Sequence, residues 1–200
     1  MQSSPEGALG AAALLARIRP SVARPRSVLL LDGASGSGKT TLAAWLAPRL
    51  RARVLALEDV YPGWGGLDAA AGLLAERILP ARAAGDPVAW RSWDWAVMRP
   101  GPIRHLLPGA RLVVEGCGAL TPASRRLADL AVVLDVDEAV RRRRILERDP
   151  PEAASGHRGW AVQERRRQAR DRPAALADLV LHGGVRLPGD RSGDPRNRPR

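Results

Sequence analysis

The chain has 200 residues, of which 45% are hydrophobic and 26% charged, a formal net charge of +11 and a single cysteine. This composition predicts one globular domain with a sizeable core, and the absence of any long apolar run excludes a membrane-spanning helix. The lone Cys117 excludes a disulfide framework and fits a cytoplasmic protein, while the basic charge favours an acidic partner such as a nucleotide, a nucleic acid or another polyphosphate.

Strand and helix patterns alternate along the chain. An Ala/Leu-rich stretch at residues 8–18 predicts an amphipathic helix rather than a secretory signal. Short apolar runs that predict buried strands occupy residues 27–33, 53–58, 111–116, 129–135 and 178–181. Helical spacing occupies residues 39–47, 67–79, 122–128, 138–148 and 159–170. The alternation predicts βαβ units and a mostly parallel sheet that is covered on both faces.

Two segments break this pattern. Residues 80–108 contain five prolines and three tryptophans, which predicts an irregular functional loop. Residues 184–200 are rich in Gly, Pro, Arg and Asp, which predicts a disordered basic tail. The chain is therefore expected to form one domain over residues 1–183, with an N-terminal helical segment at 1–26.

The segment from Gly33 to Thr40 reads GASGSGKT and matches the phosphate-binding loop, or P-loop, pattern G-x-x-x-x-G-K-[ST]. It follows a predicted strand and opens a predicted helix, so that backbone N–H groups and the helix N-terminus can surround an anion. The alternative is a glycine-rich turn that binds nothing. Lys39 is the only lysine in the chain, which indicates that its site needs an ammonium group. The residues expected to hold the triphosphate are Gly33, Ser35, Gly36, Ser37, Gly38, Lys39, Thr40 and Thr41, with Thr40 also expected to hold Mg²⁺.

Four features together resemble the uridine kinase and phosphoribulokinase-like branch of the small P-loop kinases. They are the loop in its GASGSGKTT form, the Glu58-Asp59-Val60-Tyr61 strand end, the Val113-Val114-Glu115-Gly116 strand end and a later arginine-rich helix. The resemblance covers about residues 27–182. It implies a three-layer α/β P-loop NTPase fold with a five-stranded parallel sheet in the order 2-3-1-4-5, and a lid over residues 138–170. It also implies a kinase that uses ATP with Mg²⁺ to phosphorylate a hydroxyl group of a small, nucleoside-like acceptor.

Glu58 and Asp59 would lie at the carboxyl edge of the sheet beside the P-loop, where ligands bind in such folds. Phosphoryl transfer needs a carboxylate that accepts or orients the proton of the attacking hydroxyl group. The resembled kinases have aspartate at the position of Glu58, and glutamate is one methylene longer. Three alternatives stay open: Glu58 serves as the base, Asp59 does, or neither does and activity is weak.

A second acidic residue is expected to contact Mg²⁺. Glu115 ends the strand that lies beside the first strand in the implied order, so it is favoured over Asp135 and Asp137. Asp137 is instead expected to be the N-cap of the following helix.

Arg141, Arg144 and Arg148 share one face of the arginine-rich helix. In the resembled kinases such lid arginines neutralise charge on the transferred phosphoryl group, which implies phosphate contacts for Arg141 and Arg148 and a catalytic role for Arg144. The alternative is a solvated basic face.

Tyr61, Arg91, Trp93 and Trp95 are the candidate acceptor contacts, because flat rings can stack on a base or a sugar. The tryptophans could equally pack against the core. Two other functions stay open: an ATP-binding regulatory protein whose basic surface binds nucleic acid, and a nucleotide kinase that uses Arg91 and Arg99 on the acceptor side.

Overall fold

The computed structural model describes residues 9–188. Its main sheet is parallel and contains β2 (Val28–Asp32), β3 (Ala52–Ala56), β6 (Arg111–Glu115), β7 (Leu130–Asp135) and β8 (Leu179–His182). The strands lie in the order β3-β6-β2-β7-β8. Counted among these five strands alone, this is the order 2-3-1-4-5 that the resemblance implies. The predicted α/β class is confirmed.

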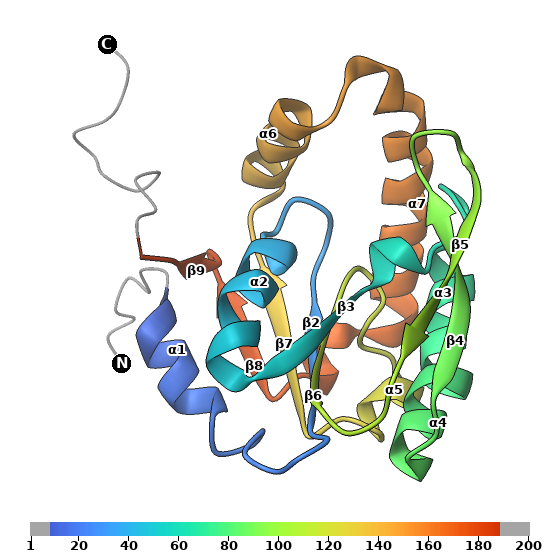
Figure 1. Ribbon diagram of the computed structural model, residues 1–200. Helices are drawn as coiled ribbons and strands as arrows, with labels where there is room; N and C mark the ends of the chain where they lie inside the picture. The colour runs from blue at the N-terminus through green and yellow to red at the C-terminus, as the bar shows by residue number, and fades with distance from the viewer. Residues whose placement is uncertain (1–8, 189–200) are drawn as a thin grey trace, which may run out of the picture.

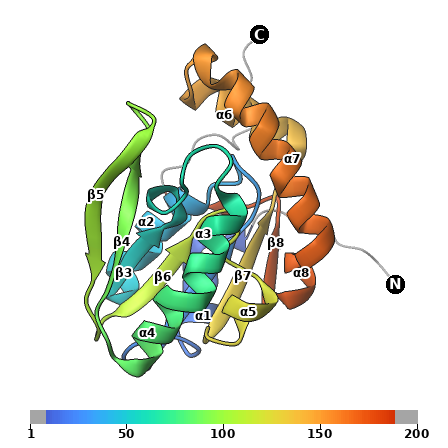
Figure 2. The ribbon, with the colours of Figure 1, turned by 90° about the vertical axis from the view of Figure 1, so that its right-hand side faces the viewer.

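Helices cover both faces of this sheet (Figures 1 and 2). One face carries α1 (Ala11–Ile18) and α2 (Lys39–Leu50). The opposite face carries α3 (Leu67–Leu73), α4 (Leu79–Ala84), α5 (Pro122–Arg125), α7 (Ala154–Asp171) and α8 (Pro173–Leu176). The remaining helix, α6 (Glu138–Arg148), stands above the carboxyl edge of the sheet. No helix in residues 9–188 is both long and apolar enough to cross a membrane.

Alternating strand residues fill two separate cores, because successive side chains of a strand point to opposite faces. Leu29 and Leu31 pack with α1 and α2. Val28 and Leu30 pack with the helices of the other face, among them Trp160 of α7. All five residues of β2 are buried. The P-loop therefore leaves the sheet from a strand that is fixed on both sides.

The prediction of an irregular loop at residues 80–108 is wrong. The segment contains α4 and an antiparallel hairpin of β4 (Val88–Asp94) and β5 (Arg99–Leu106). In β4, the side chains of Val88, Trp90 and Ser92 are buried and those between them are exposed, which is the alternation of a half-buried strand. The prolines of β5 are tolerated because they lie on an edge strand, where a missing N–H costs little.

Other boundaries also differ from the prediction. The helix at residue 39 continues past Pro48 to Leu50, whose side chain is buried, and α7 begins at Ala154 rather than at residue 159. Within the predicted tail, β9 (Val185–Arg186) pairs with β1 (Leu9–Gly10). The rest of that predicted tail, from residue 189, lies outside the described residues.

Candidate active site

The P-loop connects β2 to α2, and three of its glycines have conformations that other residues rarely adopt. The φ angles of Gly33, Gly36 and Gly38 are +149°, +78° and +94°. A Cβ atom on Gly36 would lie 2.5 Å from the carbonyl oxygen of Arg141, and one on Gly33 would lie 2.6 Å from that of Leu134. Glycine is thus required both by the backbone conformation and by the close approach of neighbouring segments.

The side chain of Lys39 folds back into the loop. It is only 6% exposed, and its Nζ donates to the carbonyl oxygen of Ala34 at 2.9 Å. Nζ also lies 3.4 Å from Ser37 Oγ and 3.6 Å from Cys117 Sγ. The ammonium group of the chain's only lysine is therefore held within the predicted anion site.

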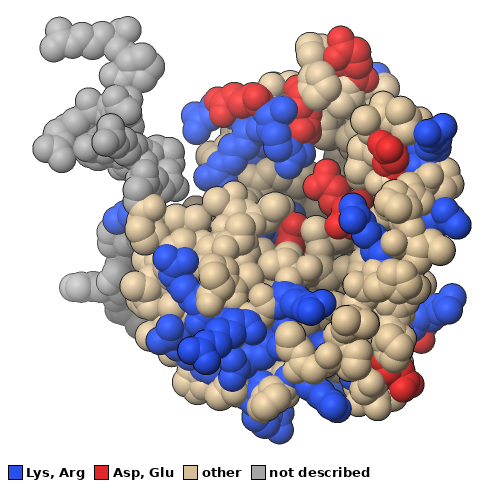
Figure 3. Space-filling view, viewed as in Figure 1, with Lys and Arg blue, Asp and Glu red and all other residues tan. Residues whose placement is uncertain are grey.

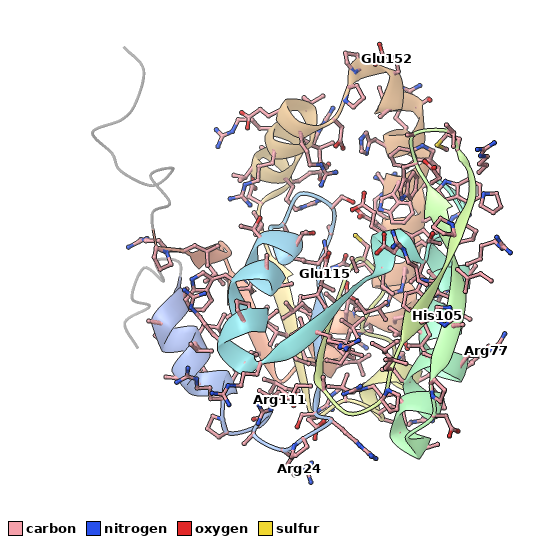
Figure 4. All side chains as sticks on the ribbon, in the orientation of Figure 1. Arg24, Arg77, His105, Arg111, Glu115 and Glu152 are labelled. Atoms are coloured by element: carbon pink, nitrogen blue, oxygen red, sulfur yellow. The ribbon has the colours of Figure 1, made fainter. Side chains whose placement is uncertain are left out.

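Thr40 and Glu115 meet beside this ammonium group. Thr40 Oγ1 donates a hydrogen bond of 2.9 Å to Glu115 Oε1. Burial raises the pKa of Glu115 above its usual range, although nearby Lys39 and the hydrogen bond from Thr40 act in the opposite direction. Figure 4 shows Glu115 near the middle of the molecule, beside α2.

This donor set fits Mg²⁺, which prefers hard oxygen ligands. A hydroxyl and a carboxylate oxygen lie together, next to the loop that would hold phosphates. Within residues 9–188, no three His, Cys, Asp or Glu side chains are grouped so as to hold a metal by themselves. A magnesium ion here would thus depend on phosphate oxygens and water for its other ligands.

Glu58 and Asp59 form part of a single 3₁₀ turn, Leu57–Asp59, at the carboxyl end of β3. Both are exposed, whereas Leu57 is fully buried and fixes the turn to the core. The indole Nε1 of Trp95 donates to the carbonyl oxygen of Glu58 at 3.0 Å. Leu57 therefore fixes the turn to the core and Trp95 fixes it to the hairpin, while the two carboxylates are open to solvent.

Two of the three predicted lid arginines contact the P-loop. Arg141 donates to the carbonyl oxygen of Ser35 and Arg144 to that of Gly36, each at 3.2 Å. As predicted, Asp137 caps the start of α6, its side chain accepting from the amides of residues 139 and 140. Arg141 and Arg144 thus point toward the loop. In Figure 3 basic side chains gather above a hollow that contains acidic ones.

Arg148 lies at the far end of α6 and pairs with its neighbour. Its Nε is 2.6 Å from Asp149 Oδ1, and this hydrogen bond lowers the pKa of Asp149. The same bond is the main reason that the pKa of Arg148 is raised, and the charge of Glu58 contributes in the same direction. Among the described residues Arg148 therefore bonds to Asp149 and not to the P-loop.

Two of the predicted acceptor contacts, Tyr61 and Arg91, bond to other parts of the protein. Tyr61 is only 5% exposed, its hydroxyl donates to the carbonyl oxygen of Cys117 at 2.7 Å, and burial raises its pKa well above the usual value. Arg91 is exposed and donates to the carbonyl oxygen of Gly101 within its own hairpin. Tyr61 belongs to the core and Arg91 to the outer face of the hairpin, because the alternation of β4 turns that position away from the body.

The tryptophans mainly pack against protein. Trp93 lies against Gly63, and Trp95 meets Trp64 edge to face with ring centroids 5.2 Å apart. Trp64 in turn meets His157 of α7 at 4.8 Å. These contacts join the hairpin, the segment after the acidic turn and α7, which supports the packing alternative for Trp93 and Trp95.

Sequence reasoning missed a buried polar cluster behind the P-loop. Asp32 is 3% exposed and accepts hydrogen bonds from the amides of Gly33, Gly118 and Leu120. Arg167 of α7 is 5% exposed and lies 3.5 Å from Asp32. The position of Asp32, directly before the first loop glycine, was the available signal. Nothing local marks Arg167 among its arginine neighbours.

A pocket of about 240 Å³ opens beside the start of α2. It is lined by Ser37, Gly38, Thr41, Leu42, Leu134, Arg144, Gly184, Val185 and Leu187. The apolar residues of this wall come from α2, β7 and the segment around β9. The pocket thus joins P-loop residues to a wall of mixed polar and apolar side chains.

Two solved structures share the fold of this chain. A possible uridine kinase from Bacillus stearothermophilus is 19% identical over 82% of this chain and 99% of its own, with a TM-score of 0.58. A candidate fructose transport system kinase from Silicibacter sp. TM1040 is 22% identical over 86% of this chain and 99% of its own, with a TM-score of 0.60. No protein-family model and no curated protein matches the sequence. The chain has the fold of the small P-loop kinases.

Proposed function

We propose that this protein is an ATP-dependent phosphotransferase that transfers the γ-phosphoryl group of ATP to a hydroxyl group of a small acceptor. The observation that carries the proposal is the burial of the chain's only lysine within a glycine loop at a helix N-terminus. An ammonium group held there, among backbone amides, is suited to the β- and γ-phosphates. The adenosine end of ATP would occupy the 240 Å³ pocket beside Thr41.

Thr40 and Glu115 would hold Mg²⁺, which supplies charge neutralisation on the phosphates when it is bound. Glu115 is the only carboxylate that the Thr40 hydroxyl contacts among the described residues. Its burial favours an ion at this position, because a buried carboxylate is costly without a partner of opposite charge.

Glu58 or Asp59 would orient the acceptor hydroxyl and take its proton. The acceptor oxygen then forms a bond to the γ-phosphorus, the bond between this phosphorus and the bridging oxygen breaks, and ADP leaves. Arg144, next to Gly36 and Gly38, would stabilise the charge that develops during transfer. Arg141 would support the same loop from Ser35.

An acceptor without a phosphate group suits this site better than a nucleotide. The region around Glu58 carries exposed carboxylates and the half-buried Trp95. Arg91, which a nucleotide acceptor would need, is engaged within its own hairpin, and Arg99 is exposed at the start of β5. A nucleoside or another neutral polyol is therefore the proposed acceptor class.

A coupled assay of ADP release over nucleosides, sugars, pantothenate and shikimate tests the proposal. At least one neutral acceptor should raise ADP release well above the acceptor-free rate, and a variant that carries both Glu58→Gln and Asp59→Asn should lose this increase. The proposal fails if no acceptor raises the rate for protein that binds ATP.

A further inference from the structure

Helix α7 contacts the phosphate-binding loop through one carboxylate. Glu164 Oε1 accepts a hydrogen bond of 2.8 Å from the backbone N–H of Ser35. The same oxygen accepts from Trp160 Nε1 at 2.9 Å and from Cys117 Sγ at 3.1 Å. Burial raises the pKa of Cys117 to about 12, so its thiol keeps the proton that it donates. One oxygen of Glu164 thus joins the loop, the helix and the segment after β6.

The helix that carries Glu164 is itself fixed to the core. Trp160 is 5% exposed and packs edge to face on Tyr61, with ring centroids 4.6 Å apart. One turn beyond Glu164, Arg167 donates to the carbonyl oxygen of Leu120 at 2.6 Å and faces Asp32. The predicted lid over residues 138–170 is therefore divided, because the side chains of α6 are all at least partly exposed whereas α7 has buried anchors.

The loop needs such a support for a physical reason. Its three glycines allow the positive φ angles observed in the loop, but glycines also allow many other backbone conformations. Ser35 lies between two of these glycines, Gly33 and Gly36. A fixed acceptor at its N–H removes that freedom before a ligand arrives and so lowers the cost of binding.

We propose that Glu164 is a positioning residue for nucleotide binding, which holds the P-loop in its anion-binding shape by accepting the N–H of Ser35. The inference deepens the proposed function and rests on it, since it concerns the same triphosphate site. The support of the loop depends on the length of the Glu164 side chain, which brings an acceptor oxygen to the N–H of Ser35, and not on the charge of the carboxylate.

Two conservative variants separate reach from charge. Glu164→Asp keeps the charge but shortens the side chain by one methylene, whereas Glu164→Gln keeps the length and an acceptor oxygen. Gln163→Ala is the matched control, because Gln163 is the adjacent residue of α7 and donates instead to the carbonyl oxygen of Trp64. Binding of Mg·ATP is measured by calorimetry, and exchange of the Ser35 amide by NMR, both without acceptor.

Glu164→Asp should weaken Mg·ATP binding by about tenfold, in keeping with the loss of one hydrogen bond to a charged group, and should speed exchange of the Ser35 amide. Glu164→Gln and Gln163→Ala should stay within about threefold of the wild type, below the loss expected for that hydrogen bond. The inference is overturned if Glu164→Asp binds like the wild type with an equally protected amide, or if Glu164→Gln is as weak as Glu164→Asp. If no acceptor is ever phosphorylated while these binding differences hold, the proposed kinase activity fails and the role of Glu164 stands.

Discussion

The hydroxyl of Thr40 and the carboxylate of Glu115 form a hydrogen bond of 2.9 Å between the first turn of α2 and the end of β6. The parallel register of β2 and β6 pairs Leu31 with Glu115, so the carboxylate arrives directly beside the P-loop. The sheet order therefore brings together two residues that are far apart in the sequence, at the point where a magnesium ion would be required.

Replacing either member of this pair should weaken the response to magnesium. Thr40→Val and Glu115→Gln are each expected to lower the apparent Mg²⁺ affinity of the ATP complex about tenfold or more, because each removes an oxygen that would hold the ion or its water. Titration of activity with Mg²⁺ at saturating ATP measures the shift. Glu152→Gln, an exposed change in the turn between α6 and α7, should leave the titration unchanged. An unaltered Mg²⁺ dependence in both pair variants would remove Glu115 and Thr40 from the metal site.

The pH dependence should follow Glu115, whose pKa is raised by burial. Because the ion requires the ionised carboxylate, Mg·ATP affinity should rise as the pH rises through this elevated pKa and then level off. In the absence of ligand, the free energy of unfolding should instead fall as the pH rises. Over the interval between the unfolded and folded pKa values the native state holds the extra proton, so the free energy of unfolding falls as the pH rises through that interval.

Glu115→Gln is the reference for both measurements, since it removes the titrating group while ATP and the rest of the protein still titrate. Mg·ATP affinity is measured by calorimetry across a pH series for the wild type and for Glu115→Gln. The difference in affinity between the two proteins should increase as the pH rises through the pKa of Glu115. A constant difference across the acidic range would contradict the assignment.

Glu58 is expected to be the more important residue of the acidic turn. Its backbone is fixed by the indole of Trp95, and its charge lies close enough to Arg148 to contribute to the raised pKa of that residue. Glu58→Gln should lower kcat by a factor of about 10² to 10⁴, the usual contribution of a general base, with little change in ATP affinity. Asp59→Asn should have a smaller effect. Equal kcat values for both variants and the wild type would exclude a catalytic role for the turn.

The role proposed for Arg144 can be tested against a neighbour on the same helix. Arg144→Ala should lower kcat by about 10- to 100-fold, because a cation that stabilises developing charge is lost. Arg142→Ala, at an exposed position of α6, should retain nearly full activity. Comparable losses in the two variants would instead indicate that α6 acts through its general positive charge, and lowering the ionic strength would then restore both.

Much of the fold could be predicted because each strand of the main sheet is a short, mostly apolar run that can be recognised from its own residues. The run Val28–Leu31 is buried on both faces, which gives a strand signal that needs no partner to be recognised. The hairpin could not be found in this way, since Pro100 and Pro102 are typical of loops and are tolerated only because β5 is an edge strand.

Within the candidate site, the residues that follow local sequence rules could be predicted, and those that depend on tertiary packing could not. The P-loop and Asp137 obey short-range rules of backbone geometry and capping, and the sequence carries those rules directly. The buried state of Tyr61 and the contacts of Glu164 and Arg167 depend on how α7 lies across the sheet. Helical spacing in an arginine-rich segment does not reveal which of its charges is covered.

In the proposed function, Lys39 and its glycine loop bind a triphosphate. Calorimetric titration of Mg·ATP into the wild type and into Lys39→Met, whose side chain is similar in length and uncharged, tests it most directly. The wild type should give a clear heat of binding, which Lys39→Met should lose, while both proteins show the same circular dichroism. No binding to the wild type, or equal binding to Lys39→Met, would contradict it.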